Sequence, residues 1–117
     1  MSKHIYHKNV VYKLTCTPTN KSYYGITTLG FGKRWKAHLQ DFHKGFYNHR
    51  PLYEAFLKYN PEHWEKEIIF VGFDEYIIKR VEMLMISNNN TVDHGYNVHR
   101  GGVGFDLLKN EFTKFIS

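Results

Sequence analysis

The sequence contains a single cysteine, Cys16, among its 117 residues. One cysteine excludes an internal disulfide framework and suits a reducing compartment. No apolar run approaches the roughly 18 residues that cross a membrane. The segment from Met1 to Asn9 carries charge and histidine without an apolar core, so it does not have the pattern of a signal peptide. These absences predict an intracellular protein without a membrane anchor, in which Cys16 is a small apolar strand residue.

The sequence has fewer acidic than basic residues, with 11 Asp and Glu against 16 Lys and Arg, which gives a net charge of +5. A basic surface favours a polyanionic partner, because each neutralised phosphate releases counterions and adds affinity. The 42% hydrophobic and 17% aromatic content is typical of a folded protein rather than a disordered one. The length fits one domain over residues 1–117.

The pattern of residues predicts an α+β fold, a small three-stranded antiparallel sheet flanked by helices. β-Branched and aromatic residues indicate a hairpin with strands at 10–16 and 22–27 and a turn at 17–21. Apolar spacing and helix-boundary residues indicate helices over about 33–44, 51–59 and 74–86, the last with Asp74 as N-cap and with Ile77, Val81 and Leu84 facing the core. A third, more buried strand is expected at 64–71, a loop to 104 and a short closing helix at 105–116.

Two tyrosines and two basic residues of this framework carry chemical interest. If the hairpin register sets Tyr12 opposite Tyr23, both hydroxyls share one face of the sheet, and Tyr24 points to the other face. Arg34 and His38 are four residues apart, so they lie on one helix face. An arginine suits a phosphate because its planar fork donates two parallel hydrogen bonds and stays charged. Taken alone, these residues also fit a buried strand and a solvated basic helix face that includes Lys33 and Lys36.

A carboxylate and an asparagine complete the set of candidates. Glu82 borders the apolar arc of the third helix, where a side chain can point into a cleft, although a surface glutamate is the ordinary explanation. Mg²⁺ commonly takes one or two protein carboxylates and fills its other positions with water and phosphate oxygens. Asn97 lies in Gly95-Tyr96-Asn97, which by itself fits a turn.

The order and spacing of these residues resemble the GIY-YIG endonuclease family over about residues 10–102. The matching segments are Val10-Val11-Tyr12, Tyr23-Tyr24-Gly25, Arg34 with His38, Glu82, Gly95-Tyr96-Asn97 and Gly101-Gly102. The departures are Val10-Val11 in place of the usual Gly-Ile, and Tyr24 in place of the usual Ile. Each match alone is weak, but the complete ordered set is highly specific.

The resemblance implies a role for each of the four residues near the start of the chain. Tyr12 is expected to orient or deprotonate the attacking water, and Tyr23 to hydrogen-bond around the scissile phosphate. Arg34 is expected to stabilise the pentavalent phosphate. His38 is expected to position Tyr12, the water or a phosphate oxygen.

The resemblance also implies a cofactor, a substrate and a setting. Glu82 is the expected ligand of Mg²⁺ or Mn²⁺, and Asn97 is expected to tie the late loop to the active site. DNA is the expected substrate, cut to 5′-phosphate and 3′-hydroxyl ends, with Lys33, Lys36 and Arg34 contacting its backbone. A nuclease domain of this small size fits a freestanding phage or mobile-element nuclease that acts in the cytoplasm of a bacterial or phage-infected cell. It would have a loose sequence preference, pair with itself or use a separate targeting protein.

Three other interpretations remain. A non-catalytic nucleic-acid-binding module on the same fold is the main alternative. A protein-interaction scaffold would leave Arg34, His38 and Glu82 without a purpose. A zinc site built from His4, His7, His94 and His99 is disfavoured, because the spacings match no closed structural site and one cysteine cannot supply the usual thiolates.

Overall fold

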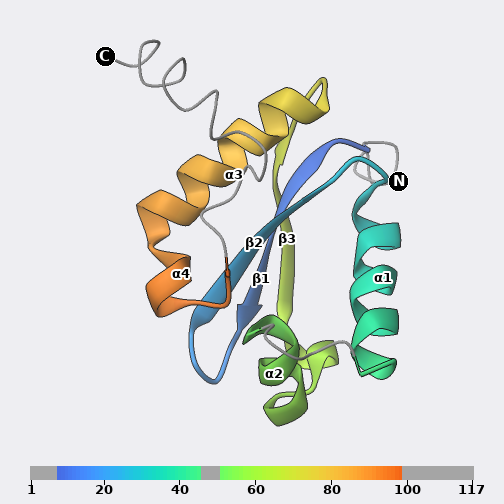
Figure 1. Cartoon of the computed structure of the whole chain (residues 1–117), viewed down its shortest axis with the longest axis vertical. Coiled ribbons are helices and arrows are strands. Elements are labelled where there is room, and N and C mark those ends of the chain that lie inside the picture. Colours follow the sequence, from blue (N-terminus) through green and yellow to red (C-terminus); the bar gives the residue numbers. More distant parts are fainter. Residues whose placement is uncertain (1–7, 46–50, 99–117) are drawn as a thin grey trace.

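The computed structural model describes residues 8–45 and 51–98, which form the predicted α+β architecture. A three-stranded antiparallel sheet of order β2-β1-β3 stands between α3 on one side and α1 on the other, with α2 near one end (Figure 1). The elements are β1 (Val10–Cys16), β2 (Lys21–Thr27), α1 (Phe31–His43), α2 (Pro51–Lys58), the 3-10 turn η2 (Pro61–His63), β3 (Glu65–Val71), α3 (Glu75–Asn89) and α4 (Thr91–His94). None of the helices in residues 8–45 and 51–98 is long and apolar enough to cross a membrane.

The β1–β2 hairpin sets the positions of the two tyrosines. Asn20 takes a left-handed conformation (φ 55°) and its N–H donates to the Cys16 carbonyl (2.8 Å), which reverses the chain. The resulting register places Tyr12 opposite Gly25 and Tyr23 opposite Leu14. The two tyrosines are therefore not directly opposite each other. They still share one face, because an offset of two residues preserves side-chain direction in a strand.

The central strand is β1, and β3 lies at an edge. Every residue of β1 except Lys13 is buried, whereas Glu65 to Glu67 of β3 are exposed and Ile68 to Val71 are only partly buried. The expectation of a more buried third strand is wrong. An apolar run is typical of a strand covered on both faces, but here the same run lies on the outer strand of a small sheet.

The main core lies between one face of the sheet and helices α1 and α2. Alternate residues of β1 (Val10, Tyr12, Leu14 and Cys16) pack there with Leu52, Tyr53, Ala55 and Phe56 of α2 and with Trp64. Tyr23, Phe31 and Trp35 pack against this cluster from β2 and α1. Cys16 is buried and unpaired, as the sequence predicted.

Helix α3 packs against β2 and β1, and α4 packs against β2. Asp74 is the predicted N-cap, since its Oδ1 accepts from the Ile77 N–H (2.9 Å). The helix ends at Asn89, beyond the expected end, because Asn90 takes the left-handed conformation that stops it (φ 52°). Leu84 was expected in the core but is 37% exposed. The helix buries Ile78 and Ile86 most deeply instead.

Helix α4 lies within the segment that was expected to be a loop, so this part of the prediction is also wrong. Some sequence-based expectations fall outside the described residues. These are Gly101-Gly102, the closing helix at 105–116, and His4, His7 and His99.

Candidate active site

The hydroxyl of Tyr12 is the centre of a buried cluster of hydrogen bonds. Tyr12 Oη lies 2.7 Å from His38 Nε2 and accepts a hydrogen bond from Arg34 Nε (3.3 Å). The Tyr12 side chain is fully buried and His38 is 1% exposed. The sheet and α1 therefore bring together three residues that the sequence predicted to act as one site.

Gly25 creates the space that this hydroxyl needs. Gly25 faces Tyr12 across the β1–β2 ladder, and a Cβ built on it would overlap the Tyr12 ring end and hydroxyl. The same Cβ would lie 2.8 Å from Cε1 of Tyr23. On the other side of Tyr12, the register of β3 shifts between Val11 and Tyr12, a bulge of the kind often found beside active sites.

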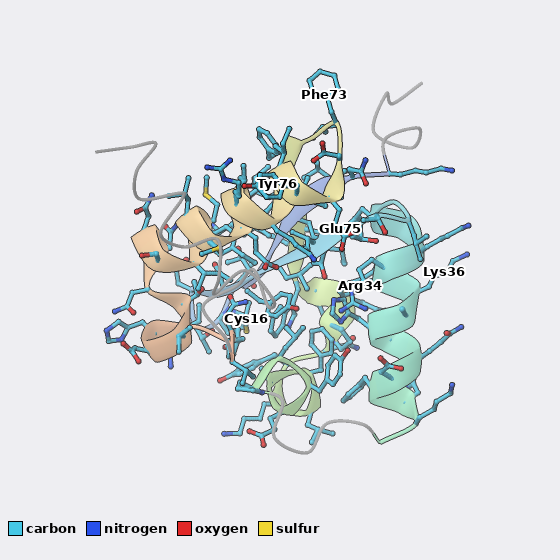
Figure 2. The ribbon with its side chains drawn as sticks, turned by 45° about the horizontal axis from the view of Figure 1, so that its top comes forward. Cys16, Arg34, Lys36, Phe73, Glu75 and Tyr76 are labelled. Atoms are coloured by element: carbon cyan, nitrogen blue, oxygen red, sulfur yellow. The ribbon has the colours of Figure 1, made fainter. Side chains whose placement is uncertain are left out.

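Helix α1 has one face toward the Tyr12 hydroxyl and another face toward solvent. Arg34 and His38 lie one turn apart on the inner side, and the Gly30 carbonyl accepts the Arg34 N–H (3.2 Å) at the start of the helix. Figure 2 shows Arg34 directed from α1 toward the interior and Lys36 directed away from it. Lys33 and Lys36 are both exposed, so their side chains are available to an external polyanion.

Tyr23 completes the group on the same face. Its ring centroid lies 6.2 Å from that of Tyr12 and 5.8 Å from that of His38, the latter edge-on. Burial raises the pKa of Tyr23, the charge of Arg34 lowers it, and the negative charge of Glu82 raises it, with a net rise. Glu82 of α3 therefore lies within electrostatic range of the Tyr23 hydroxyl.

Burial and charge act in opposite directions on the Tyr12 phenol. Burial raises the pKa of Tyr12 well above its ordinary value, and the neighbouring Tyr23 raises it further. Arg34 lowers it through both its positive charge and its hydrogen bond. Burial lowers the pKa of Arg34, but its tyrosine neighbours, Tyr12 foremost, raise it above its ordinary value. Tyr12 is thus a neutral phenol at neutral pH, beside a permanent positive charge that favours its ionised form.

Glu82 is the described carboxylate that could take part in holding a divalent cation at this site. Glu82 is partly buried and is the carboxylate whose charge reaches the site. Within residues 8–45 and 51–98, no three His, Cys, Asp or Glu side chains gather as a closed metal cage would require. A single carboxylate fits Mg²⁺ or Mn²⁺, which keep water and take substrate oxygens as further ligands.

Asn97 lies outside the Tyr12 cluster and holds the late loop against β2. Its Nδ2 donates to the Tyr24 carbonyl (2.8 Å), and its Oδ1 accepts from the Tyr24 N–H (2.9 Å) and from the Thr91 hydroxyl (2.8 Å). Asn97 is 6% exposed. The structure thus places Asn97 as a clamp on the strand that carries Tyr23, which agrees with the expected tie between loop and site.

Tyr53 is a member of the cluster that the sequence did not reveal. Its hydroxyl lies 2.9 Å from His38 Nδ1, and its side chain is 1% exposed. Tyr53 occurs next to Leu52 in the apolar arc of α2, where a tyrosine is ordinarily a core residue. Only the contact between α2 and α1 in the folded protein shows that the hydroxyl meets a site histidine.

Comparisons with known proteins find the same fold in solved structures. No family model and no curated protein matches the sequence. Among solved structures, the catalytic domain of the homing endonuclease I-TevI matches with a TM-score of 0.66 and 28% identity, covering 79% of this chain and 99% of that one. A point mutant of the catalytic domain of the intron endonuclease I-TevI matches with a TM-score of 0.69 and 28% identity, covering 80% of this chain and 95% of that one. The chain therefore has the fold of the I-TevI catalytic domain, and this fold together with the ordered motif residues supports a nuclease of the GIY-YIG type.

Proposed function

We propose that the protein is a metal-dependent DNA endonuclease that hydrolyses phosphodiester bonds to 5′-phosphate and 3′-hydroxyl ends. The observation that carries the proposal is the Tyr12 hydroxyl, held between Arg34 Nε and His38 Nε2 on the sheet face that Tyr23 shares. The resemblance to two structures of the I-TevI catalytic domain supports the same activity.

Tyr12 supplies the polar atom next to the attacking water. Its oxygen accepts a proton from the water while its own proton passes to His38 Nε2, 2.7 Å away. This transfer leaves the phenol neutral before and after the step, which suits a buried side chain whose pKa is raised. Arg34 limits the cost of any negative charge that develops on the Tyr12 oxygen.

Arg34 also faces the phosphate. Its Nε–H is engaged with Tyr12, and the guanidinium carries four further N–H donors in a fixed plane. These donors suit two phosphate oxygens as negative charge builds on them. Tyr23, beside Tyr12, can donate to a phosphate oxygen because burial keeps its phenol protonated.

Glu82 is the residue that would hold Mg²⁺ or Mn²⁺. A bound divalent ion polarises the phosphate and stabilises the departing 3′ oxygen. The negative charge of Glu82, close enough to raise the pKa of Tyr23, supports this assignment. Lys33 and Lys36, on the exposed side of α1, are proposed to contact the DNA backbone.

The test is incubation of the purified protein with supercoiled plasmid and Mg²⁺, with and without a chelator. We expect nicked or linear product only without chelator, and no product from Glu82→Gln, which keeps the side-chain shape and removes the charge. Glu75→Gln is the matched control, because Glu75 is exposed on the first turn of the same helix and pairs with Lys79 (3.0 Å). We expect Glu75→Gln to cut like wild type.

Two outcomes would contradict the proposal. Intact plasmid with wild-type protein that nevertheless binds DNA would identify a non-catalytic nucleic-acid-binding module. Normal cleavage by Glu82→Gln would remove Glu82 from metal binding.

A further inference from the structure

His38 is held at both ring nitrogens by tyrosine hydroxyls from two different elements. Nε2 lies 2.7 Å from Tyr12 Oη of β1, and Nδ1 lies 2.9 Å from Tyr53 Oη of α2. The His38 and Tyr53 rings meet at 73° with centroids 5.7 Å apart. Each of the three side chains is at most 1% exposed.

The hydrogen-bond directions that we assign start from the one partner that can only donate. Arg34 Nε donates to the Tyr12 oxygen, and in the arrangement assigned here the Tyr12 hydroxyl donates its proton to His38 Nε2, 2.7 Å away. A neutral imidazole that accepts at Nε2 carries its proton on Nδ1 and donates from that atom. The Tyr53 oxygen, 2.9 Å from Nδ1, is the acceptor in this arrangement.

We infer that Tyr53 is a positioning residue for DNA cleavage, acting through His38. The Tyr53 hydroxyl holds the Nδ1–H form of His38, so that the Nε2 lone pair faces the Tyr12 hydroxyl. Tyr53 itself touches neither substrate nor metal. The inference rests on the proposed function, since it names the group that orients the proton acceptor of that same site.

The physical reason is that a neutral histidine accepts a proton at one ring nitrogen only while the other ring nitrogen carries its own proton. The partner of one ring nitrogen decides which tautomer and which ring orientation the imidazole adopts. Without an acceptor at Nδ1, the proton can move to Nε2, and the Tyr12 hydroxyl then meets a donor instead of an acceptor. A base oriented by a third group is also the arrangement that activates many nucleophiles.

A purely structural role is the competing explanation, because the Tyr53 ring belongs to the main core and lies 5.9 Å from the Phe56 ring. Tyr53→Phe separates the two roles, since it removes the hydroxyl and keeps the ring. Tyr59→Phe is the matched control. Tyr59 follows α2 directly and packs against the same core.

The experiment is a double-mutant cycle in single-turnover cleavage of a DNA duplex with Mg²⁺. We expect Tyr53→Phe to lose about 10-fold in rate in the wild-type background, the lower end of what loss of an orienting partner costs. In the His38→Gln background the same change should lose less than about 2-fold, because the residue through which it acts is absent. Tyr59→Phe should match wild type in both backgrounds. Equal losses from Tyr53→Phe in the two backgrounds, or none in the first, would overturn the inference.

The ¹⁵N chemical shifts of His38 provide a second readout that does not depend on cleavage. We expect a protonated Nδ1 and an unprotonated Nε2 in the wild-type protein, and a shift of the proton toward Nε2 in Tyr53→Phe. An unchanged tautomer in Tyr53→Phe would overturn the inference even if DNA is cut. Failure of the wild-type protein to cut DNA, with the tautomer change observed, would instead overturn the proposed function and leave Tyr53 as the residue that orients His38.

Discussion

Replacement of Gly25 by alanine is expected to damage the site by a single added carbon. The new Cβ would lie 2.8 Å from Tyr23 Cε1, whereas ordinary contact begins at 3.4 Å, and the end of the Tyr12 ring lies closer still. The Tyr12 and Tyr23 rings or the strand must therefore shift by about 0.6 Å or more, which disturbs the 2.7 Å contact between Tyr12 and His38. Overpacking of this kind costs about 1–3 kcal/mol of stability.

The assay for Gly25→Ala is urea unfolding together with single-turnover DNA cleavage. We expect the stability loss given above and a loss of cleavage of about 10²-fold, since misplacement of a reacting group by about an ångström has effects of that size. Gly32→Ala is the control, because its Cβ would meet nothing within 4 Å and Gly32 lies in the exposed part of α1. Wild-type stability and cleavage in Gly25→Ala would refute the claim that Gly25 makes room for Tyr12.

Three further predictions concern Arg34, Asn97 and Tyr12. Arg34→Lys should reduce single-turnover cleavage by about 10²-fold, because a point charge lacks the planar fork, and a loss of only a few-fold would assign Arg34 to a general basic face. Asn97→Ala should lower the free energy of unfolding in urea by about 1–3 kcal/mol, because it leaves the backbone N–H and C=O of Tyr24 without their partner; unchanged stability with lost cleavage would contradict the clamp. The raised pKa of Tyr12 means that above about pH 10 the unfolded chain loses a proton that the folded protein keeps, so stability falls as pH rises. In Tyr12→Phe, the free energy of unfolding measured in urea should fall less steeply as the pH rises, and the same steepness as in wild type would contradict the burial of this phenol.

The strands and helices were predictable where local chemistry decides them. The β-branched run at 10–16, the turn around Asn20 and the Asp74 cap each specify their structure through nearby residues, and the structure has them in place. The Arg34/His38 pair was predictable for the same reason, since four residues make one helical turn.

Three features that the sequence did not reveal depend on contacts between distant segments. The hairpin register places Gly25, rather than Tyr23, opposite Tyr12, and nothing local to Tyr12 specifies that pairing. The apolar end of β3 could not be distinguished from a buried central strand without the strand order. Tyr53 resembles any core tyrosine of an amphipathic helix until α2 is packed against His38. Sequence patterns therefore predicted the catalytic candidates, while the partners that orient them emerged only from tertiary structure.

The most direct test of the account compares three phenylalanine variants in single-turnover DNA cleavage at one salt concentration. Tyr12→Phe removes the hydroxyl bonded to Arg34 and His38, and should lose at least about 10²-fold, the lower range for a positioned proton-transfer group. Tyr23→Phe, on the same sheet face, should also be impaired. Tyr24→Phe should cut like wild type, because Tyr24 pairs with Lys13 on the opposite face. Full cleavage by Tyr12→Phe, or equal losses in Tyr12→Phe and Tyr24→Phe, would contradict the placement of the reaction at the Tyr12 hydroxyl.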